Sequence, residues 1–146
     1  MTAHIRAAGW ADMEAIYGLL TAMHAENALA PLHEPKVRGK IGDVLSKGVA
    51  LIAESGGIAV ATMGLERQAW WYSTGEFLVN PWIYIHPDFR ASTLARRLLD
   101  TASAVAAEND VPLVIDIASP VEPERKAALF RRRGMRPIGG LFIEGK

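Results

Sequence analysis

The sequence predicts an α+β fold: a mixed, mostly antiparallel central sheet with helices on both faces. Two helical segments precede a hairpin turned by glycines, and a strand-helix-strand unit follows it within a chain of 146 residues. A hairpin requires antiparallel pairing, whereas a strand-helix-strand unit requires a parallel crossover, so the sheet must contain both kinds of pair. The predicted order is β-α-α-β-β-β-α-β-α-β in a single domain, residues 1–146.

Strand and helix signals in the first third of the chain are clear. A short strand is expected at His4–Ala7. Apolar residues then recur at three- and four-residue steps from Met13, which predicts a helix that ends near Pro31. A second helix is expected to start near Pro35, because proline is tolerated in a first turn, and to end before Gly48. Two helices therefore separate the first strand from the next.

The middle of the chain reads as a hairpin. Residues 49–54 and 58–66 are compact apolar runs on either side of a serine and two glycines, and we expect them to pair. The polar connection that follows carries Trp70, Trp71 and Tyr72. Such a cluster is more often hairpin-end packing or a subunit contact than a ligand platform. It therefore hints at a homodimer.

A strand-helix-strand unit comes next. A strand is expected over residues 77–85, interrupted at Asn80 and Pro81, where the ladder must open on one side because proline has no amide hydrogen to donate. A long amphipathic helix is expected over residues 93–109. Residues 113–117 are nearly all apolar, as in a strand buried on both faces. Asp116 is the exception, and we expect a structural role for it because an unpaired charge there would be costly.

The last elements are a charged helix and a strand. The helix is expected over residues 122–133, with Glu122 and Lys126 paired at helical spacing. Gly134 follows it in the usual stop position. A final strand is expected over residues 135–143, broken by a pair of glycines.

Composition and charge exclude several functions. Sixteen basic residues balance sixteen acidic ones, so no overall charge draws the chain to nucleic acid or to an anionic membrane. The chain has no cysteine, which excludes disulfides and thiolate metal sites, and its histidines lack metal-ligand spacing. No apolar run approaches the roughly 18 residues of a membrane span. We expect a cytoplasmic protein without a signal peptide, with no membrane, metal or nucleic-acid partner.

A functional pattern lies where the strand ending at residue 85 turns into the helix after it. The first turn of a helix leaves amides unpaired and adds the positive end of the helix dipole, so it suits an anion. Small side chains that would let a phosphate approach this backbone are those of Ala91, Ser92, Thr93 and Ala95. Arg90 and Arg96 would add charge-assisted contacts. A plain helix cap would explain Ser92 and Thr93 equally well.

This segment carries a resemblance to a known family. Residues 83–99, IYIHPDFRASTLARRLL, resemble motif A of the GNAT superfamily of acyl-CoA-dependent N-acetyltransferases. That motif is an apolar strand, a turn with proline, an aromatic residue and arginine, then Gln/Arg-x-x-Gly-x-Gly/Ala and a helix with paired leucines. Here it reads Arg90-x-x-Thr93-x-Ala95. Residues 128–135 resemble a second signature, LY-x-x-x-GF, and the order of elements resembles that fold over nearly the whole chain.

The resemblance implies a function and a binding mode. It implies transfer of acetyl from the cosubstrate acetyl-CoA to a primary amine of a small molecule or peptide, by direct attack within a ternary complex. The strand segment implied to bind the cofactor is Ile83, Tyr84 and Ile85, with the backbone of Ile83 and Ile85 pairing with the pantetheine arm. The amides implied to cradle the pyrophosphate are those of Ala91, Ser92, Thr93, Leu94, Ala95 and Arg96, with Arg90 at the entrance of the loop.

Three residues depart from the family pattern. Thr93 replaces the first glycine, which narrows the approach to the backbone but offers a hydroxyl to a phosphate oxygen. Phe130 stands where many members have the tyrosine that protonates the departing CoA thiolate. Pro123 stands where an asparagine often contacts the cofactor. The general acid is therefore unassigned by the resemblance.

Acid and base candidates come from the residues themselves. Tyr84 or Tyr72 could replace the missing acid, although a thiol of pKa about 8.5 leaves near neutral pH without full protonation. Glu76, which opens the central strand, is the candidate base for the attacking ammonium. A solvated strand end is the alternative explanation of Glu76.

Two other functions stay open. Phe130 and the missing asparagine favour a non-catalytic acyl-CoA-binding or interaction module on the same fold. A small nucleotide-binding α/β domain would bind ATP or NAD in competition with CoA. The lack of a second strand-helix-strand unit argues against this third reading.

Overall fold

A computed structural model describes residues 2–117 and 119–145 of the chain. Its contacts divide the chain into two compact units, Met1–Asp116 and Ile117–Lys146, which are described separately. Among the described residues, all strands and the first three α-helices belong to the first unit, and the fourth helix belongs to the second. The single domain remains a prediction.

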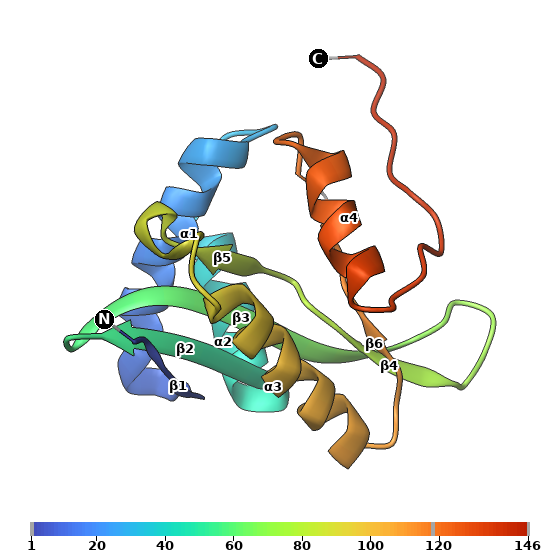
Figure 1. Cartoon of the computed structure of the whole chain (residues 1–146), viewed down its shortest axis with the longest axis horizontal. Helices are drawn as coiled ribbons and strands as arrows, with labels where there is room; N and C mark the ends of the chain where they lie inside the picture. The colour runs from blue at the N-terminus through green and yellow to red at the C-terminus, as the bar shows by residue number, and fades with distance from the viewer. Residues whose placement is uncertain (1, 118, 146) are drawn as a thin grey trace. The chain divides into compact units, whose positions relative to one another are not determined.

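The elements follow the predicted order through most of the chain (Figure 1). They are β1 (His4–Ala7), the 3₁₀ turn η1 (Trp10–Asp12), α1 (Met13–Asn27), α2 (Glu34–Lys47), β2 (Val49–Ser55), β3 (Ile58–Ala69), β4 (Glu76–Val79), β5 (Ile83–Ile85), the 3₁₀ turn η2 (Pro87–Phe89), α3 (Leu94–Glu108), β6 (Leu113–Val114) and α4 (Pro123–Arg132). The first strand, both early helices, the hairpin and the long helix are confirmed. Each of them is specified by local periodicity and by a nearby proline or glycine.

The sheet is mixed and mostly antiparallel, as predicted. Its strand order is β1-β2-β3-β4-β6, with β5 also paired to β3. Every pair is antiparallel except β4 with β6, which is parallel. The parallel pair is the one joined through α3, because such a crossover needs a long connection.

The single strand predicted over residues 77–85 is wrong, because the structure has two strands there. β4 pairs with the end of β3, at residues 66–69, whereas β5 pairs with its middle, at residues 61–63. The break falls at Asn80 and Pro81, as expected from the missing proline amide. Because the hydrogen bonding to β3 is interrupted at this break, β4 and β5 pair with different parts of β3.

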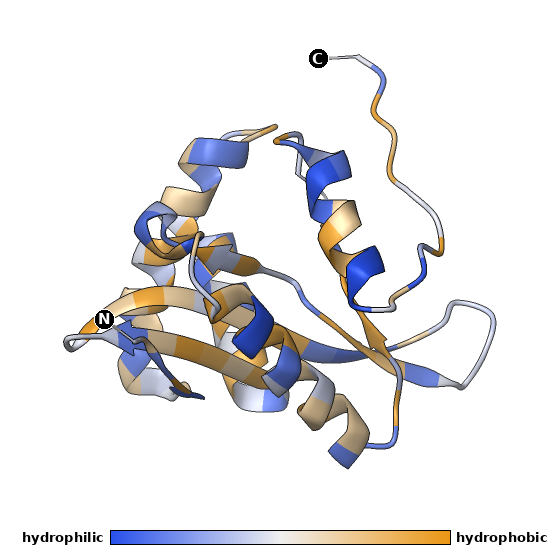
Figure 2. Cartoon of the chain, viewed as in Figure 1, coloured by the Kyte–Doolittle hydropathy of each residue, from blue (hydrophilic) through white to orange (hydrophobic). Residues whose placement is uncertain are grey.

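Helices cover both faces of this sheet, as predicted. Figure 1 shows α1 and α2 behind the strands and α3 in front of them. Ala50 and Ile52 of β2 pack into the cluster formed with α1 and α2, while the alternating Leu51 and Ala53 are also buried. Because successive strand residues point to opposite faces, β2 has apolar contacts on both sides. Apolar residues accordingly gather on the inner strands in Figure 2.

Two expectations near the end of the chain are wrong. The strand expected at residues 113–117 is only Leu113–Val114, and both of its residues are half-buried rather than buried on both faces. Residues 135–143 form no strand. Pro137 lacks an amide hydrogen, Gly139 has φ +152°, and Phe142 is 98% exposed, so this segment has neither the donors nor the packing of a strand.

The second unit contains the predicted charged helix, α4. Gly134 follows it with φ +87°, the left-handed conformation that glycine adopts without strain, and this confirms the predicted stop. Glu122 pairs with Arg125 at 3.5 Å, while Lys126 donates to the Ser119 hydroxyl at 2.8 Å. These contacts replace the predicted pair of Glu122 with Lys126 as the bonds that begin the helix.

Candidate functional site

β5 presents one unoccupied edge. Among the described residues it pairs with β3 alone. The carbonyl of Trp82 accepts from β3 at 3.1 Å and the amide of His86 donates to β3 at 2.8 Å, so Tyr84, midway between them, faces β3 as well. Because backbone groups alternate between the two edges of a strand, Ile83 and Ile85 direct theirs away from β3. These are the residues whose backbone the resemblance assigns to the pantetheine arm.

Asn80 secures the point where β4 and β5 part. Its side chain is buried, with Nδ2 donating to the Asp116 carbonyl at 3.0 Å and Oδ1 accepting from the Asp116 amide at 2.7 Å. The side-chain amide thus extends the β4–β6 ladder by one step beyond the Val79–Val114 pair. The structural role expected for Asp116 is performed by its main chain, and its side chain is exposed.

The turn after β5 ends in a helix cap made by Ser92. The Ser92 hydroxyl donates to the Phe89 carbonyl and accepts from the Leu94 amide at 3.2 Å. Thr93, at the N-cap position, makes no capping bond with its side chain. The plain capping explanation therefore applies to Ser92 but not to Thr93, whose exposed hydroxyl accepts from no amide of the helix.

The first turn of α3 has the features of an anion site. The amides of Ala95 and Arg96 lie in that turn, where a helix offers them no acceptor. Ala91 is exposed, so little side-chain bulk covers the backbone there. The exposed Arg96 guanidinium makes no hydrogen bond or ion pair to any residue that the structure describes. A free cation and unpaired amides therefore occur together at the positive end of α3.

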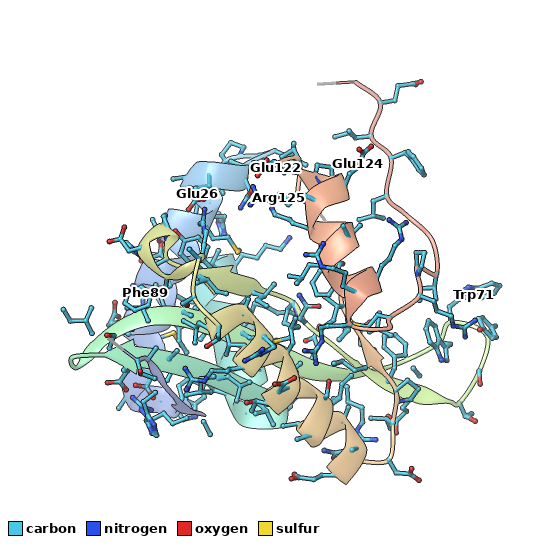
Figure 3. All side chains as sticks on the ribbon, viewed as in Figure 1. Glu26, Trp71, Phe89, Glu122, Glu124 and Arg125 are labelled. Atoms are coloured by element: carbon cyan, nitrogen blue, oxygen red, sulfur yellow. The ribbon has the colours of Figure 1, made fainter. Side chains whose placement is uncertain are left out.

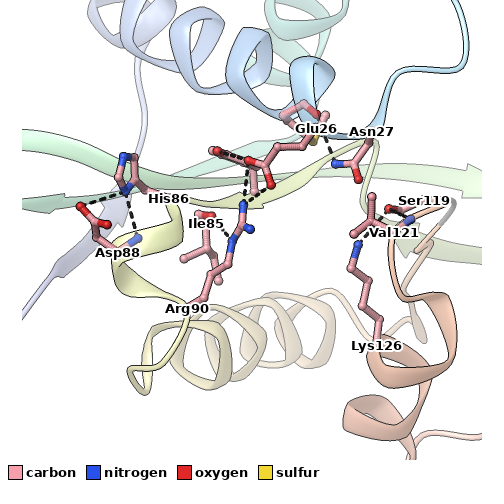
Figure 4. Close-up of polar contacts among 11 residues, drawn as sticks. Glu26, Asn27, Ile85, His86, Asp88, Arg90, Ser119, Val121 and Lys126 are labelled. Atoms are coloured by element: carbon pink, nitrogen blue, oxygen red, sulfur yellow. Dashed lines mark hydrogen bonds and ion pairs between the residues drawn. The ribbon is translucent and has the colours of Figure 1, made fainter.

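Arg90, by contrast, is held by two partners (Figure 4). Its Nη2 donates to both carboxylate oxygens of Glu26, at 2.7 and 2.9 Å, and its Nε donates to the Ile85 carbonyl at 2.9 Å. The Tyr84 hydroxyl donates to the same carboxylate at 2.6 Å. Arg90 thus joins the end of α1 to the end of β5.

The Tyr84 side chain is nearly buried beneath this ion pair. Its ring is 5% exposed, and the Arg90 guanidinium lies 5.5 Å from the ring centroid. Burial and the hydrogen bond to the Glu26 carboxylate raise the pKa of Tyr84 to about 12. At neutral pH the phenol therefore keeps its proton and donates it in the hydrogen bond to Glu26.

Glu76 lies at the opposite end of α3 from the turn. It forms an ion pair with Arg67 at 3.1 Å, and Arg67 also donates to the Asn109 side chain, at 2.9 Å, directly after α3. A helix of 15 residues is about 22 Å long. The structure therefore does not bring the predicted base together with the turn at Arg90.

Of the three aromatic residues after β3, Trp70 packs at the end of the hairpin, while Trp71 and Tyr72 are exposed. The rings of Trp70 and Phe77 lie 4.2 Å apart, and the Trp70 amide donates to the Gly75 carbonyl, which closes the hairpin loop. Trp71 projects from this loop and is 94% exposed (Figure 3). Tyr72, the other predicted acid candidate, lies in the same loop and is 69% exposed. The homodimer remains a prediction.

Glu26 is the residue that the sequence reasoning missed. No motif marks it, because its partners lie 58 and 64 residues further along the chain. One local signal was present: a carboxylate in the last turn of a helix faces the negative end of the dipole and is unfavourable there without a cation. An acid one residue before the end of α1 therefore indicated a basic partner.

Two further features are absent from the described part of the chain. No group of three or more histidine, aspartate or glutamate side chains there could hold a metal ion. No helix there is long and apolar enough to cross a membrane.

Comparison with known proteins identifies the fold. No family model and no curated protein sequence matches the chain. A GCN5-related N-acetyltransferase from Ralstonia eutropha JMP134 superposes with a TM-score of 0.79 and 20% identity, over 98% of both chains. A predicted acetyltransferase with acetyl-CoA from Clostridium acetobutylicum has a TM-score of 0.79 and 16% identity, over 99% of this chain and 96% of that one. The chain has the GNAT fold.

An aminoglycoside 6'-N-acetyltransferase from Acinetobacter haemolyticus shares the GNAT fold too. It has a TM-score of 0.75 and 19% identity, over 98% of this chain and 97% of that one. The fold predicted from motif A is therefore confirmed. Within this GNAT fold, β5 and the turn before α3 bring together the Ile83 and Ile85 edge, Arg90 and the first-turn amides, whereas Glu76 lies apart from them.

Proposed function

We propose that the protein is a GNAT-type N-acetyltransferase that transfers acetyl from acetyl-CoA to a primary amine of a small molecule or peptide. The observation that carries the proposal is a strand edge at Ile83 and Ile85 that no second described strand pairs with and that is followed by the exposed turn before α3. A ligand with amides at one end and a diphosphate at the other matches this succession. Solved structures of the same fold, one with acetyl-CoA and one with a CoA bisubstrate analogue, support the choice.

Each part of the cofactor has a partner in this proposal. The pantetheine arm carries two amides and pairs with the edge of β5 as an added strand would. The pyrophosphate lies over the backbone from Ala91 to Arg96, where the first-turn amides of Ala95 and Arg96 and the helix dipole favour negative charge. The Arg96 side chain adds a charge-assisted contact, since it has no partner among the described residues.

The reaction joins the amine nitrogen to the acetyl carbon in a ternary complex. As the C–N bond forms, the C–S bond breaks, the amine loses a proton and the CoA sulfur takes one up. Glu76 as the base and Tyr84 as the acid remain predictions. Water would have to relay the proton in either case, because Glu76 is paired with Arg67 and the Tyr84 proton is shared with Glu26.

Calorimetric titration with CoA tests the binding mode. Thr93→Glu places a carboxylate and extra bulk over the amides that hold the diphosphate, so we expect CoA affinity to fall by about tenfold or more. Ala104→Glu is the matched control, because it adds the same charge to an exposed position further along α3. A wild-type protein with no saturable CoA binding, or a Thr93→Glu variant that binds as well as Ala104→Glu, would contradict the proposal.

A second candidate is a non-catalytic acyl-CoA-binding module on this fold. The ion pair of Glu76 with Arg67 and the hydrogen bond from Tyr84 to Glu26 favour it, because each candidate group already has a partner. Thiol release from acetyl-CoA distinguishes the two functions. The amines tested should include an aminoglycoside and a peptide with a free N-terminal alanine. Two structural neighbours are named as an aminoglycoside 6'-N-acetyltransferase and a ribosomal-protein-alanine N-acetyltransferase. Tight CoA binding without thiol release would favour the module.

A further inference from the structure

The ion pair of Glu26 with Arg90 reaches the proposed cofactor edge through a single bond. While Nη2 of Arg90 is held by the Glu26 carboxylate, its Nε donates to the Ile85 carbonyl at 2.9 Å. That carbonyl is one of the groups that Ile83 and Ile85 direct away from β3. Arg90 therefore already occupies one acceptor of the edge that the pantetheine arm would use.

This contact has a consequence for strand register. An added strand bonds to the amide and the carbonyl of the same residue, and a shift of two residues would preserve its pattern. With the Ile85 carbonyl taken by Arg90, Ile83 is the residue of β5 that offers both groups. A carbonyl oxygen has two lone pairs, so the guanidinium, which takes one of them on the side where the arm would bind, disfavours the register in which the arm would pair at Ile85.

Three contacts hold the guanidinium in place. Glu26 accepts from Arg90 with both oxygens and from the Tyr84 hydroxyl, and Tyr84 is held in turn by its pairing with Thr62 of β3. One nitrogen, Nη2, makes both bonds to the carboxylate, and hydrogen bonds between two charged groups are stronger than those between neutral groups. Both residues are exposed, with side-chain exposures of 46% for Arg90 and 34% for Glu26, so water screens the attraction between the charges.

We propose that Glu26 is a positioning residue that holds Arg90 on the Ile85 carbonyl and so sets the register of the pantetheine arm at Ile83. The inference rests on the proposed function for its ligand. It leaves the diphosphate to the α3 amides and Arg96. The opposite arrangement, in which Arg90 leaves Glu26 to bind the diphosphate, makes Glu26 a competitor of CoA and predicts effects of the opposite sign.

Glu26→Gln tests the inference with Glu14→Gln as the matched control. Glu14 lies on the same helix, twelve residues before Glu26, and also pairs with an arginine, Arg38, which is not bonded to β5. We expect Glu26→Gln to weaken CoA binding about tenfold, as loss of one charge-assisted contact predicts, and Glu14→Gln to leave it unchanged. Glu26→Asp, which keeps the charge, should recover part of the affinity. Tighter CoA binding by Glu26→Gln would overturn the inference.

ADP separates the two ends of the cofactor, because it carries a diphosphate without the pantetheine arm. Glu26→Gln and Arg90→Gln should each leave ADP affinity unchanged while weakening CoA binding, and the double variant should be no worse than either single one. Weaker ADP binding by Arg90→Gln would show that Arg90 contacts the diphosphate and would overturn the inference.

Hydrogen exchange tests, without any ligand, whether Glu26 holds Arg90 and β5 in place. Amides of residues 83–93 should exchange faster in Glu26→Gln than in Glu14→Gln, because Arg90 is then no longer held on the Ile85 carbonyl. Equal exchange in the two variants would refute the positioning role. If the wild-type protein bound no CoA, the proposed function would fail, and this measurement would still decide what Glu26 does.

Discussion

At the scale of single residues, the Arg6 side chain joins three segments of the chain, β1, β2 and the 3₁₀ turn before α1. Arg6 of β1 donates from Nε to Glu54 of β2 at 2.6 Å and from Nη2 to Asp12 at 2.8 Å. Asp12 in turn accepts from the Gly9 amide at 2.9 Å, which closes the 3₁₀ turn before α1. Two hydrogen bonds, the larger effect coming from Arg6 and the smaller from the Gly9 amide, lower the pKa of Asp12 to about 2.

This pKa predicts a pH-dependent contribution to stability. Because the folded-state pKa of Asp12 lies below the unfolded value, the contribution is present above pH about 4 and is lost as the pH falls towards 2. Asp12→Asn should therefore lower the free energy of unfolding by on the order of 1–2 kcal/mol at pH 7 and have little effect at pH 2. Urea denaturation at both pH values measures this. Asp43→Asn, at an exposed position of α2, is the control, and an equal loss for Asp12→Asn at both pH values would refute the prediction.

At the scale of elements, the close approach of β5 to β3 depends on a glycine. A Cβ on Gly64 of β3 would lie 2.9 Å from two carbons of the Trp82 ring. Trp82 is 4% exposed, and its Nε1 donates to Thr62 Oγ1 at 3.1 Å, so movement of the ring would break a buried hydrogen bond. The absence of a side chain at Gly64 is what allows Trp82 to pack at the start of β5.

Gly64→Ala should accordingly destabilise the protein. Overpacking of a closed core costs about 1–3 kcal/mol, so the midpoint of denaturant unfolding should fall. Gly39→Ala makes the same change on the exposed face of α2, where nothing lies within 4 Å of the new Cβ. That control should be neutral or stabilising by up to about 1 kcal/mol, because alanine has the higher helix propensity. Similar midpoints for the two variants would contradict the prediction and show that the Trp82 ring moves to make room for the new Cβ.

At the scale of the whole molecule, charge is balanced. Sixteen basic and sixteen acidic residues leave a formal net charge of zero, and the isoelectric point is about 6.9. Many of these charges form ion pairs that join one element to another, such as Lys40 of α2 with Glu66 of β3 at 2.7 Å. Little net charge is left to keep molecules apart in solution near neutral pH.

Solubility should therefore depend on pH in a simple way. At low ionic strength it should be lowest near pH 6.9, because molecules without net charge repel one another least, and it should rise on either side. Light scattering of concentrated protein between pH 5.5 and pH 8.5 measures this, and about 0.15 M salt should reduce the dependence by screening. A scattering maximum well away from pH 7 would contradict the prediction.

The sequence alone determined the helices, the hairpin, the mixed sheet and the turn before α3. Their signals are local: apolar periodicity in α3, a proline at the start of α2, glycines between β2 and β3, and motif A around Arg90. Tertiary structure decided the division of one predicted strand into β4 and β5, the distance of Glu76 from the turn, and the partner of Arg90. Each of these depends on residues far apart in the chain, such as Glu26 and Arg90, and local spacing carries no information about which of them meet.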